Sequence, residues 1–273
     1  MSGKLYIVGT PIGNLEDFSP RGRRILSEVD FIAAEDTRVT VKLLNHLGIS
    51  KPMVAYFEHN KKERGNTVIE RILSGENCAI VTDAGMPAIS DPGEDLIREC
   101  HEQGIQVESV PGPTAFATAL ALSGMPSGRF CFEGFLSVNK PSRKKHLEEI
   151  KNERRTLIFY EAPHKLIKTL DDMYEAFGER KIAIVREITK IHETVMRTSF
   201  SEAIEFYKTQ EPRGEYVLII EGAKEEIVNY TLEDAVKLAK KFIDEGHPAS
   251  TAAKEAAKLT GIKKSDIYKQ MLV

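Results

Sequence analysis

Two carboxylates, a hydroxyl and a guanidinium stand side by side in the run AAEDTR, residues 33–38. Glu35 or Asp36 could accept the proton of a substrate hydroxyl, and Arg38 could orient that carboxylate. The run also fits the start of a helix, because Asp36 or Thr37 can cap the next segment and acidic groups are favoured at a helix N-terminus. Capping accounts for only one residue of the run, so both interpretations stay open at this point.

The stretch VTDAGMPAISDPG, residues 81–93, follows an apolar run and contains two prolines, two glycines and two aspartates. Such a stretch is long for a bare connection between two elements. Gly85 allows close backbone approach or a positive φ angle, and Pro92 with Gly93 begins a helix whose first amides face the loop. We therefore predict that this loop holds a small molecule, mainly through backbone groups.

Two further loops have unusual compositions: VGTPIGN, residues 8–14, and PGPTA, residues 111–115. The first fits neither the dinucleotide pattern G-x-G-x-x-G nor the phosphate loop G-x-x-x-x-G-K-[ST], which argues against a nucleoside triphosphatase. The second opens a helix of small residues, which either pack closely on a sheet or leave room for an adenine-sized ring. Because H-E-x-x-H and G-x-S-x-G patterns are missing, we expect neither a metal site nor a hydrolase.

The elements around these loops predict how the loops are positioned. In the first half of the chain, short β-rich runs alternate with helical patterns, which is typical of a mostly parallel sheet with helices on its faces. Ligands of such sheets bind outside the carboxyl ends of the strands. All four loops follow a predicted strand, so we expect them to converge on one rim. The predicted strands lie at residues 5–8, 31–35, 53–57, 78–82 and 106–110.

A cluster of glycine, proline and serine at residues 124–128 predicts a domain boundary. The strands beyond it, interspersed with helices, indicate a second α/β domain with more antiparallel pairing. From Thr231 the strands stop, and three short helices resemble a helix-turn-helix segment. The predicted domains are residues 1–124, 125–228 and 229–273.

Composition excludes some classes of protein. The 273 residues carry a formal net charge of -3, so any nucleic-acid contact must come from local patches. Two such patches, residues 140–155 and 248–273, are basic; they are either solvated faces or phosphate contacts. The three cysteines stand far apart and are expected to be buried and reduced. We expect a cytoplasmic protein without a membrane segment, because neither a signal peptide nor an apolar run of about 20 residues is present.

The motifs taken in order resemble the bacterial ribosomal RNA small subunit methyltransferase I family of the tetrapyrrole methylase superfamily. They are LYIVGTPIGNLED, FIAAEDTR, VTDAGMPAISDPG, VPGPTA, FCFEGF, RTLIFYEAPHK and GEYVLIIEG. The resemblance covers nearly the whole chain. It implies two α/β domains of the tetrapyrrole methylase type with S-adenosylmethionine in the cleft between them, and a homodimer. It also implies 2′-O-methylation of a cytidine in the decoding region of 16S rRNA, with the small ribosomal subunit as partner.

The resemblance implies roles for individual residues. In one place the sequence departs from the pattern: VGTPIG is only a degenerate match to the glycine-rich first loop of relatives that methylate tetrapyrroles. We predict Glu35 or Asp36 as the base and Arg38 as its orienter. The donor-binding candidates are Thr10, Pro11, Gly13, Asp83, Gly85, Met86, Ile89, Ser90, Pro111, Gly112, Pro113, Thr114, Ala115, Tyr160 and Glu215. The RNA-binding candidates are Arg143, Lys144, Lys145, Arg186, Lys190, Lys263 and Lys264.

Two other functions compete with this prediction. A methylase of a small tetrapyrrole or corrinoid precursor would need neither basic patches nor a helical tail. A non-enzymatic RNA-binding assembly protein would use the donor only as a sensed ligand, and it would incorporate no methyl label into RNA. Deletion of residues 231–273 separates the first rival from an RNA enzyme, and a labelling assay separates the second.

Overall fold

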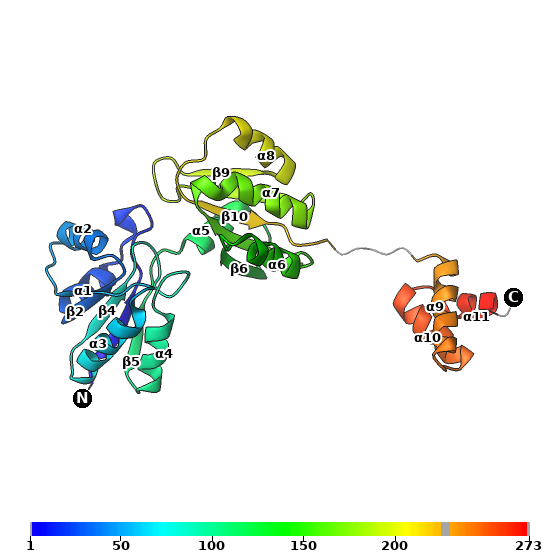
Figure 1. The fold of residues 1–273 in the computed structure, drawn as a ribbon, viewed down its shortest axis with the longest axis horizontal. Coiled ribbons are helices and arrows are strands. Elements are labelled where there is room, and N and C mark those ends of the chain that lie inside the picture. Colours follow the sequence, from blue (N-terminus) through cyan, green and yellow to red (C-terminus); the bar gives the residue numbers. More distant parts are fainter. Residues whose placement is uncertain (1, 225–229, 272–273) are drawn as a thin grey trace. The chain divides into compact units, whose positions relative to one another are not determined.

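The computed structural model describes residues 2–224 and 230–271, and the chain forms two compact units, residues 1–223 and 224–273 (Figure 1). The first unit contains two five-stranded sheets. We call residues 2–114, which carry the first sheet, the first lobe, and residues 115–223, which carry the second sheet, the second lobe.

The first lobe alternates strands and helices, as the sequence predicts. Its five strands are all parallel, in the order β3-β2-β4-β1-β5. The elements are β1 (Lys4–Val8), the 3-10 helix η1 (Leu15–Asp17), α1 (Pro20–Glu28), β2 (Phe31–Ala34), α2 (Thr37–Leu47), β3 (Met53–Ala55), α3 (Lys61–Leu73), β4 (Cys78–Val81), α4 (Glu94–Glu102) and β5 (Gln106–Val110).

Both faces of the first sheet are covered by helices. Every residue of β2 and β4 is buried, as expected of strands inside a parallel sheet. On one face, Leu26 of α1 and Leu44 of α2 join the core. On the other face, Ile72 of α3 and Leu96 of α4 do so, together with the buried thiol of Cys78. Helices on both faces leave the carboxyl edge of the sheet as the place where its loops gather.

The second lobe has a mixed sheet in the order β6-β7-β10-β8-β9, in which only β6 and β7 run parallel. Together with the parallel first sheet, it confirms the predicted fold class. The elements are α5 (Ala115–Ser123), β6 (Phe130–Phe135), α6 (Lys140–Ile150), β7 (Thr156–Glu161), η2 (Pro163–Lys165), α7 (Leu166–Phe177), β8 (Lys181–Arg186), β9 (Thr194–Ser199), α8 (Phe200–Thr209) and β10 (Tyr216–Ile220).

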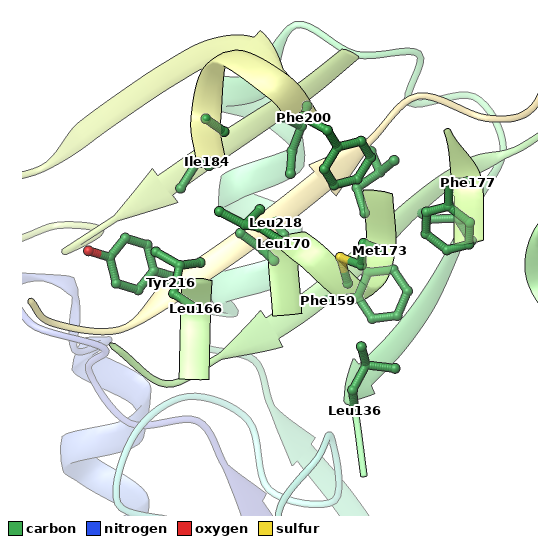
Figure 2. Packing of buried hydrophobic residues seen from close by; sticks show 14 of the residues in the cluster. Leu136, Phe159, Leu166, Leu170, Met173, Phe177, Ile184, Phe200, Tyr216 and Leu218 are labelled. Carbon is green, nitrogen blue, oxygen red and sulfur yellow. The ribbon is translucent and has the colours of Figure 1, made fainter. Parts of the chain in front are cut away.

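A continuous apolar core lies between one face of the second sheet and helices α6, α7 and α8. Figure 2 shows Phe159 and Leu218 of the sheet facing Leu170 and Met173 of α7, with Phe200 of α8 beside them. All five side chains are fully buried. This core holds the strands of the second sheet in place. Residues at the ends of these strands line the cavity described below.

Helix α5 covers the opposite face of the second sheet, where Ala119 and Leu120 pack against Ile158, Val185 and Val217. The predicted first domain, residues 1–124, includes this helix, whereas its apolar contacts are with the second sheet. Small apolar residues occur all around α5, so its pattern does not show which sheet it covers. As a result, the PGPTA loop leads directly from the first sheet into the second lobe.

The second unit consists of α9 (Leu232–Asp244), α10 (Ala249–Thr260) and α11 (Lys264–Met271), drawn in orange to red in Figure 1. Its own core is made of small side chains, including Ala235, Ala253 and Ala256, which pack with Ile267. A capping box at Thr231 begins α9. These helices confirm the predicted C-terminal helical segment.

Candidate functional site

Four loops leave the carboxyl ends of strands in the first sheet and lie next to one another. The backbone of Thr10, after β1, pairs with that of Gly85, after β4, through N–H to carbonyl distances of 2.9 and 3.1 Å. Gly9 and Gly112 are in direct backbone contact, which joins the loop after β1 to the PGPTA loop. The predicted convergence of these loops on one rim is therefore seen.

A cavity of about 290 Å³ opens at this rim and is lined by residues of both lobes. Its volume is just below the range for ligand pockets, about 300–1,000 Å³. The predicted donor-binding residues that line it are Asp83, Gly85, Met86, Ile89, Ser90, Thr114, Ala115, Tyr160 and Glu215. Glu35 lines it as well. We call this space the donor cavity, after the ligand that the sequence predicts for these residues.

The other donor-binding candidates lie elsewhere. Thr10 and Pro11 line a second cavity of about 230 Å³, on the α2 side of the rim. Gly13 packs against Lys190 of the second lobe, and Gly112 packs against the loop after β1. Neither Gly112 nor its proline neighbours line the donor cavity; these neighbours are Pro111 and Pro113.

The backbone beside the donor cavity is strained. Within the described residues, the non-glycine residues with positive φ are Ala88, Ser90, Glu187 and Thr189, with φ between 54° and 67°. They occur in two loops, one from each lobe, and Ser90 and Glu187 line the cavity. Such conformations cost about 1–3 kcal/mol each and are often found at ligand sites. The strain supports the prediction that backbone groups of residues 81–93 are arranged for a ligand.

Carboxylates dominate the polar lining of the donor cavity. The Glu35 carboxylate accepts a hydrogen bond from the Asp83 N–H at 3.3 Å, and the Asp83 carboxylate accepts one from the Asp36 N–H at 3.2 Å. Burial raises the pKa of Glu35 and that of Asp83. Burial also raises the pKa of Asp91 to about 7, and the charges of Glu35, Asp83 and Glu215 act in the same direction. The cavity therefore favours a cationic ligand.

Asp36 and Arg38 are bound to each other at the start of α2. The Asp36 side chain caps the helix by accepting the Arg38 N–H at 2.8 Å, and the two side chains form an ion pair at 2.6 Å. Hydrogen bonds from Arg38 lower the pKa of Asp36 to about 2. The Arg38 side chain is 88% exposed, and neither residue lines the donor cavity. Of the three predicted catalytic residues, only Glu35 faces the cavity.

Tyr160 connects the second sheet to the start of α5. Its hydroxyl accepts a hydrogen bond from the Phe116 N–H at 3.0 Å, and its ring contacts those of Phe132 and Phe135 edge-on. Burial raises the pKa of Tyr160 to about 12. The ring therefore forms a fixed, neutral wall of the cavity, suited to an aromatic ligand ring.

The RNA-binding candidates are scattered. Arg143 is a correction: it is 3% exposed and forms a buried ion pair with Asp172 at 2.6 Å, so it is not available to a phosphate. Lys144 pairs with Glu175 on the surface. Lys145 pairs with Glu149, and Lys190 lines the donor cavity and pairs with Glu187. Arg186 is half-buried at the end of β8. Lys263 and Lys264 lie in the second unit.

Several residues that line the donor cavity were not predicted from the sequence. They are Ile12, Ala84, Asp91, Phe135, Glu161, Ala162, Glu187, Ile188, Tyr216 and Val217. Asp91 belongs to the loop at residues 81–93, and its charge within that predicted ligand loop could have identified it. The alternation along β7 and β10 indicates which residues share a face of a strand, but it does not show which strand ends face the first lobe.

Residues 2–224 and 230–271 contain no group of three or more His, Cys, Asp or Glu side chains placed to hold a metal ion. None of the helices in the same residues has the length and apolar character needed to cross a membrane.

Comparison with known proteins identifies the family. The sequence profile of the tetrapyrrole (corrin/porphyrin) methylases matches residues 4–204, and that of the RsmI C-terminal HTH domain matches residues 233–273. The ribosomal RNA small subunit methyltransferase I of Halalkalibacterium halodurans is 45% identical over 270 residues, or 97% of this chain and 93% of that protein. The protein of the same name from Thermotoga maritima is 47% identical over 220 residues, or 81% of this chain and 99% of that protein.

Solved structures show the same fold over about four fifths of the chain. The methyltransferase CobJ superposes with a TM-score of 0.62 at 19% identity, over 81% of this chain and 95% of that one. A Thermus thermophilus uroporphyrin-III C-methyl transferase, complexed with S-adenyl homocysteine, gives 0.57 at 18% identity, over 80% of this chain and 97% of that one. Methyltransferases of this family use S-adenosylmethionine. The chain belongs to the tetrapyrrole (corrin/porphyrin) methylases and, within them, to the ribosomal RNA small subunit methyltransferase I family.

Proposed function

We propose that this chain transfers the methyl group of S-adenosylmethionine to small-subunit ribosomal RNA, at the 2′-oxygen of a cytidine ribose in the decoding region of 16S rRNA. The observation that carries the proposal is the 45% identity to a protein named for this RNA, over 97% of the chain. The match of residues 233–273 to the C-terminal domain of that family favours RNA over a tetrapyrrole precursor.

The residues of the donor cavity fit S-adenosylmethionine. The backbone of the loop at residues 81–93 would hold the polar groups of the donor, and Tyr160 with Thr114 would contact its adenine. The carboxylates of Asp83, Asp91 and Glu215 complement its positive charges. When bound, S-adenosylmethionine supplies an electrophilic methyl group on a positively charged sulfur.

Positioning and proton removal are the tasks of the chain itself. We assign Glu35 the role of proton acceptor for the substrate hydroxyl, because it faces the cavity and burial raises its pKa towards a useful range. Asp36 and Arg38 hold the start of α2, and the Asp36 N–H holds the Asp83 carboxylate beside Glu35. In this arrangement they are positioning residues.

Incubation with a methyl-labelled donor and small ribosomal subunits tests the proposed function. We expect label in 16S rRNA, and mass mapping of the RNA should place it on one cytidine ribose. Label on a base would contradict the 2′-oxygen assignment. A protein that binds the donor and the subunit but transfers no label would be an assembly factor, and methylation of a corrinoid precursor alone would support the small-molecule rival.

Asp91 predicts a pH dependence of donor binding. At pH 6 the carboxyl is mostly protonated and at pH 8 it is ionised, so S-adenosylmethionine should bind up to about tenfold more tightly at pH 8. Calorimetry at both pH values measures this change, and Asp91→Asn should flatten it. S-adenosylhomocysteine, which lacks the sulfonium charge, should depend less on pH. An unchanged pH profile in the variant would show that another group titrates.

The same group affects folding stability in the opposite direction. Its pKa of about 7 in the folded chain is above the ordinary value of 3.8, so the folded state holds a proton that the unfolded state has lost between these values. The contribution of Asp91 to the free energy of unfolding therefore falls as pH rises from about 4 to 7. Urea unfolding of wild type and Asp91→Asn over this range should show the difference.

Deletion of residues 224–273 should weaken RNA binding but leave the first unit folded. The second unit has a core of its own. The match to the Thermotoga maritima relative covers 81% of this chain, and the unmatched part is about as long as the second unit. We expect the KM for the small subunit to rise about tenfold with a shallower salt dependence, because Lys263 and Lys264 are lost. The kcat should change less than about threefold. Loss of donor binding in calorimetry would contradict this separation.

A further inference from the structure

A second cavity of about 230 Å³ lies beside the donor cavity, between α2 and the loops after β1 and β4. Asp83 lines both cavities. The backbone pair of Thr10 and Gly85 joins the two linings, because Thr10 lines the second cavity and Gly85 lines the donor cavity. A molecule in the second cavity would thus lie next to the carboxylate that also borders the donor.

Two buried hydroxyls of the second cavity have no partner. Thr40 of α2 and Thr82 after β4 are each 3% exposed, both line the cavity, and their Oγ1 atoms form no hydrogen bond within the described chain. Thr10 differs, because its hydroxyl donates to the Thr82 carbonyl at 3.0 Å. A buried hydroxyl without a partner is costly, and native structures rarely leave one in this state unless a ligand or water completes it.

The remaining lining has the chemistry of a nucleotide site. Leu15 is 48% exposed at the rim of the cavity, and Val39 and Leu43 of α2 supply further apolar surface. Lys42 is exposed, and it forms no ion pair with any residue that the structure describes. A single nucleotide of an RNA strand requires three kinds of group: hydroxyls that bind its ribose, apolar side chains that contact its base and an ammonium that reaches its phosphate.

We propose that this second cavity binds the acceptor nucleotide of the RNA, with its ribose at Thr40 and Thr82, its phosphate at Lys42 and its reactive hydroxyl towards Asp83. The Glu35 carboxylate, which accepts the Asp83 N–H at 3.3 Å, is the adjacent group that takes up the proton of that hydroxyl. The inference rests on the proposed function and deepens it, because it names the place of the substrate. It also changes the assignment of Thr10 and Pro11, which border the acceptor nucleotide rather than the donor. Asp83, which borders both cavities, then lies where the two substrates meet.

Steady-state methylation of small ribosomal subunits tests the assignment. In the double variant Thr40→Val/Thr82→Val, which keeps the volume but removes both hydroxyls, we expect the KM for subunits to rise roughly tenfold. Leu43→Trp, which fills the cavity, should raise it by about 30-fold or more. The Kd of S-adenosylhomocysteine, measured by calorimetry, should stay within about twofold in both. Val41→Thr, on the next position of α2 and outside the cavity lining, is the matched control and should behave as wild type.

Each outcome decides the proposal. Wild-type KM values in the double variant and in Leu43→Trp would overturn it, and so would a weakened Kd for S-adenosylhomocysteine with an unchanged KM, since the cavity would then belong to the donor. The melting temperature of the double variant should equal or exceed that of wild type, because unpartnered hydroxyls are replaced by methyl groups; a clear fall would show that they bond within the protein. If wild-type protein places no label in RNA, the proposed function itself fails, and the site with it.

Discussion

Replacing Glu35 by glutamine is expected to lower the kcat for RNA methylation by roughly 100-fold or more, which is the usual contribution of a positioned base. The amide cannot accept the proton of the hydroxyl, although it keeps the size of the carboxylate and an oxygen for the Asp83 N–H. The Kd of S-adenosylhomocysteine should change less than about threefold. Single-turnover assays with saturating subunits, combined with calorimetry, separate these two quantities.

Asp36→Asn is the matched comparison, because it makes the same change at the adjacent residue. The pKa of about 2 makes Asp36 a poor base, and its carboxylate is already occupied by Arg38. We expect its kcat to fall far less than that of Glu35→Gln, because asparagine still caps α2. A larger loss in Asp36→Asn than in Glu35→Gln would move the base from Glu35 to Asp36.

Gly112→Ala is expected to destabilise the first unit by about 2–3 kcal/mol and to lower its Tm by roughly 5–10 °C. A Cβ at this position would lie 2.8 Å from the Cα, the carbonyl carbon and the carbonyl oxygen of Gly9. Backbone atoms cannot move aside by changing rotamer, so one of the two loops must shift. Because Thr114 and Ala115 line the donor cavity just beyond this contact, donor affinity should fall at least about tenfold.

Gly128→Ala provides the control for this prediction. A Cβ there meets nothing within 4 Å, and Gly128 does not have a positive φ. Its Tm and its donor affinity should match those of wild type. Calorimetric melting and titration of the two variants give both numbers. Equal behaviour of Gly112→Ala and wild type would mean that the loops after β1 and β5 separate without cost.

The alternation of strand and helix in the first half of the chain was sufficient to predict the first lobe. Short runs such as CAIV, bounded by glycine and polar residues, correspond to β4, which is buried along its whole length. The rim followed from this, because carboxyl ends of parallel strands share an edge. The loops that follow predicted strands therefore indicated Asp83, Gly85 and Glu35 as candidates.

Long-range contacts were harder to predict. Helix α5 is apolar all around, and its partner sheet depends on packing that local sequence does not encode. Arg143 stands in a basic run, and the run shows no sign that its partner Asp172 lies on α7. Tyr216 and Val217 are predicted as strand residues. Their position at the cavity depends on how β10 pairs with β7 and β8, which the local sequence does not show.

The separation of the catalytic candidates also depended on geometry. Glu35, Asp36 and Arg38 are adjacent in sequence, yet the turn from β2 into α2 directs Glu35 to the cavity and leaves Arg38 88% exposed. The ion pair of Asp36 and Arg38 depends on the capped start of α2. The sequence left capping and a catalytic role open for this run. Asp36 therefore caps the helix, and the proposed chemistry is left to Glu35 of the same run.

The central place of β1 in its sheet sets an order of events during synthesis. Leu5 pairs with Cys78 of β4 on one side and with Val107 of β5 on the other. At 5–20 residues per second, roughly 4–14 s separate the translation of Val8 from that of Cys78. The earliest strand therefore waits with both edges open, and the sheet closes around it only after residue 110 has left the ribosome. An unpaired strand edge can pair with other chains, so the nascent LYIV segment is exposed to misassociation until then.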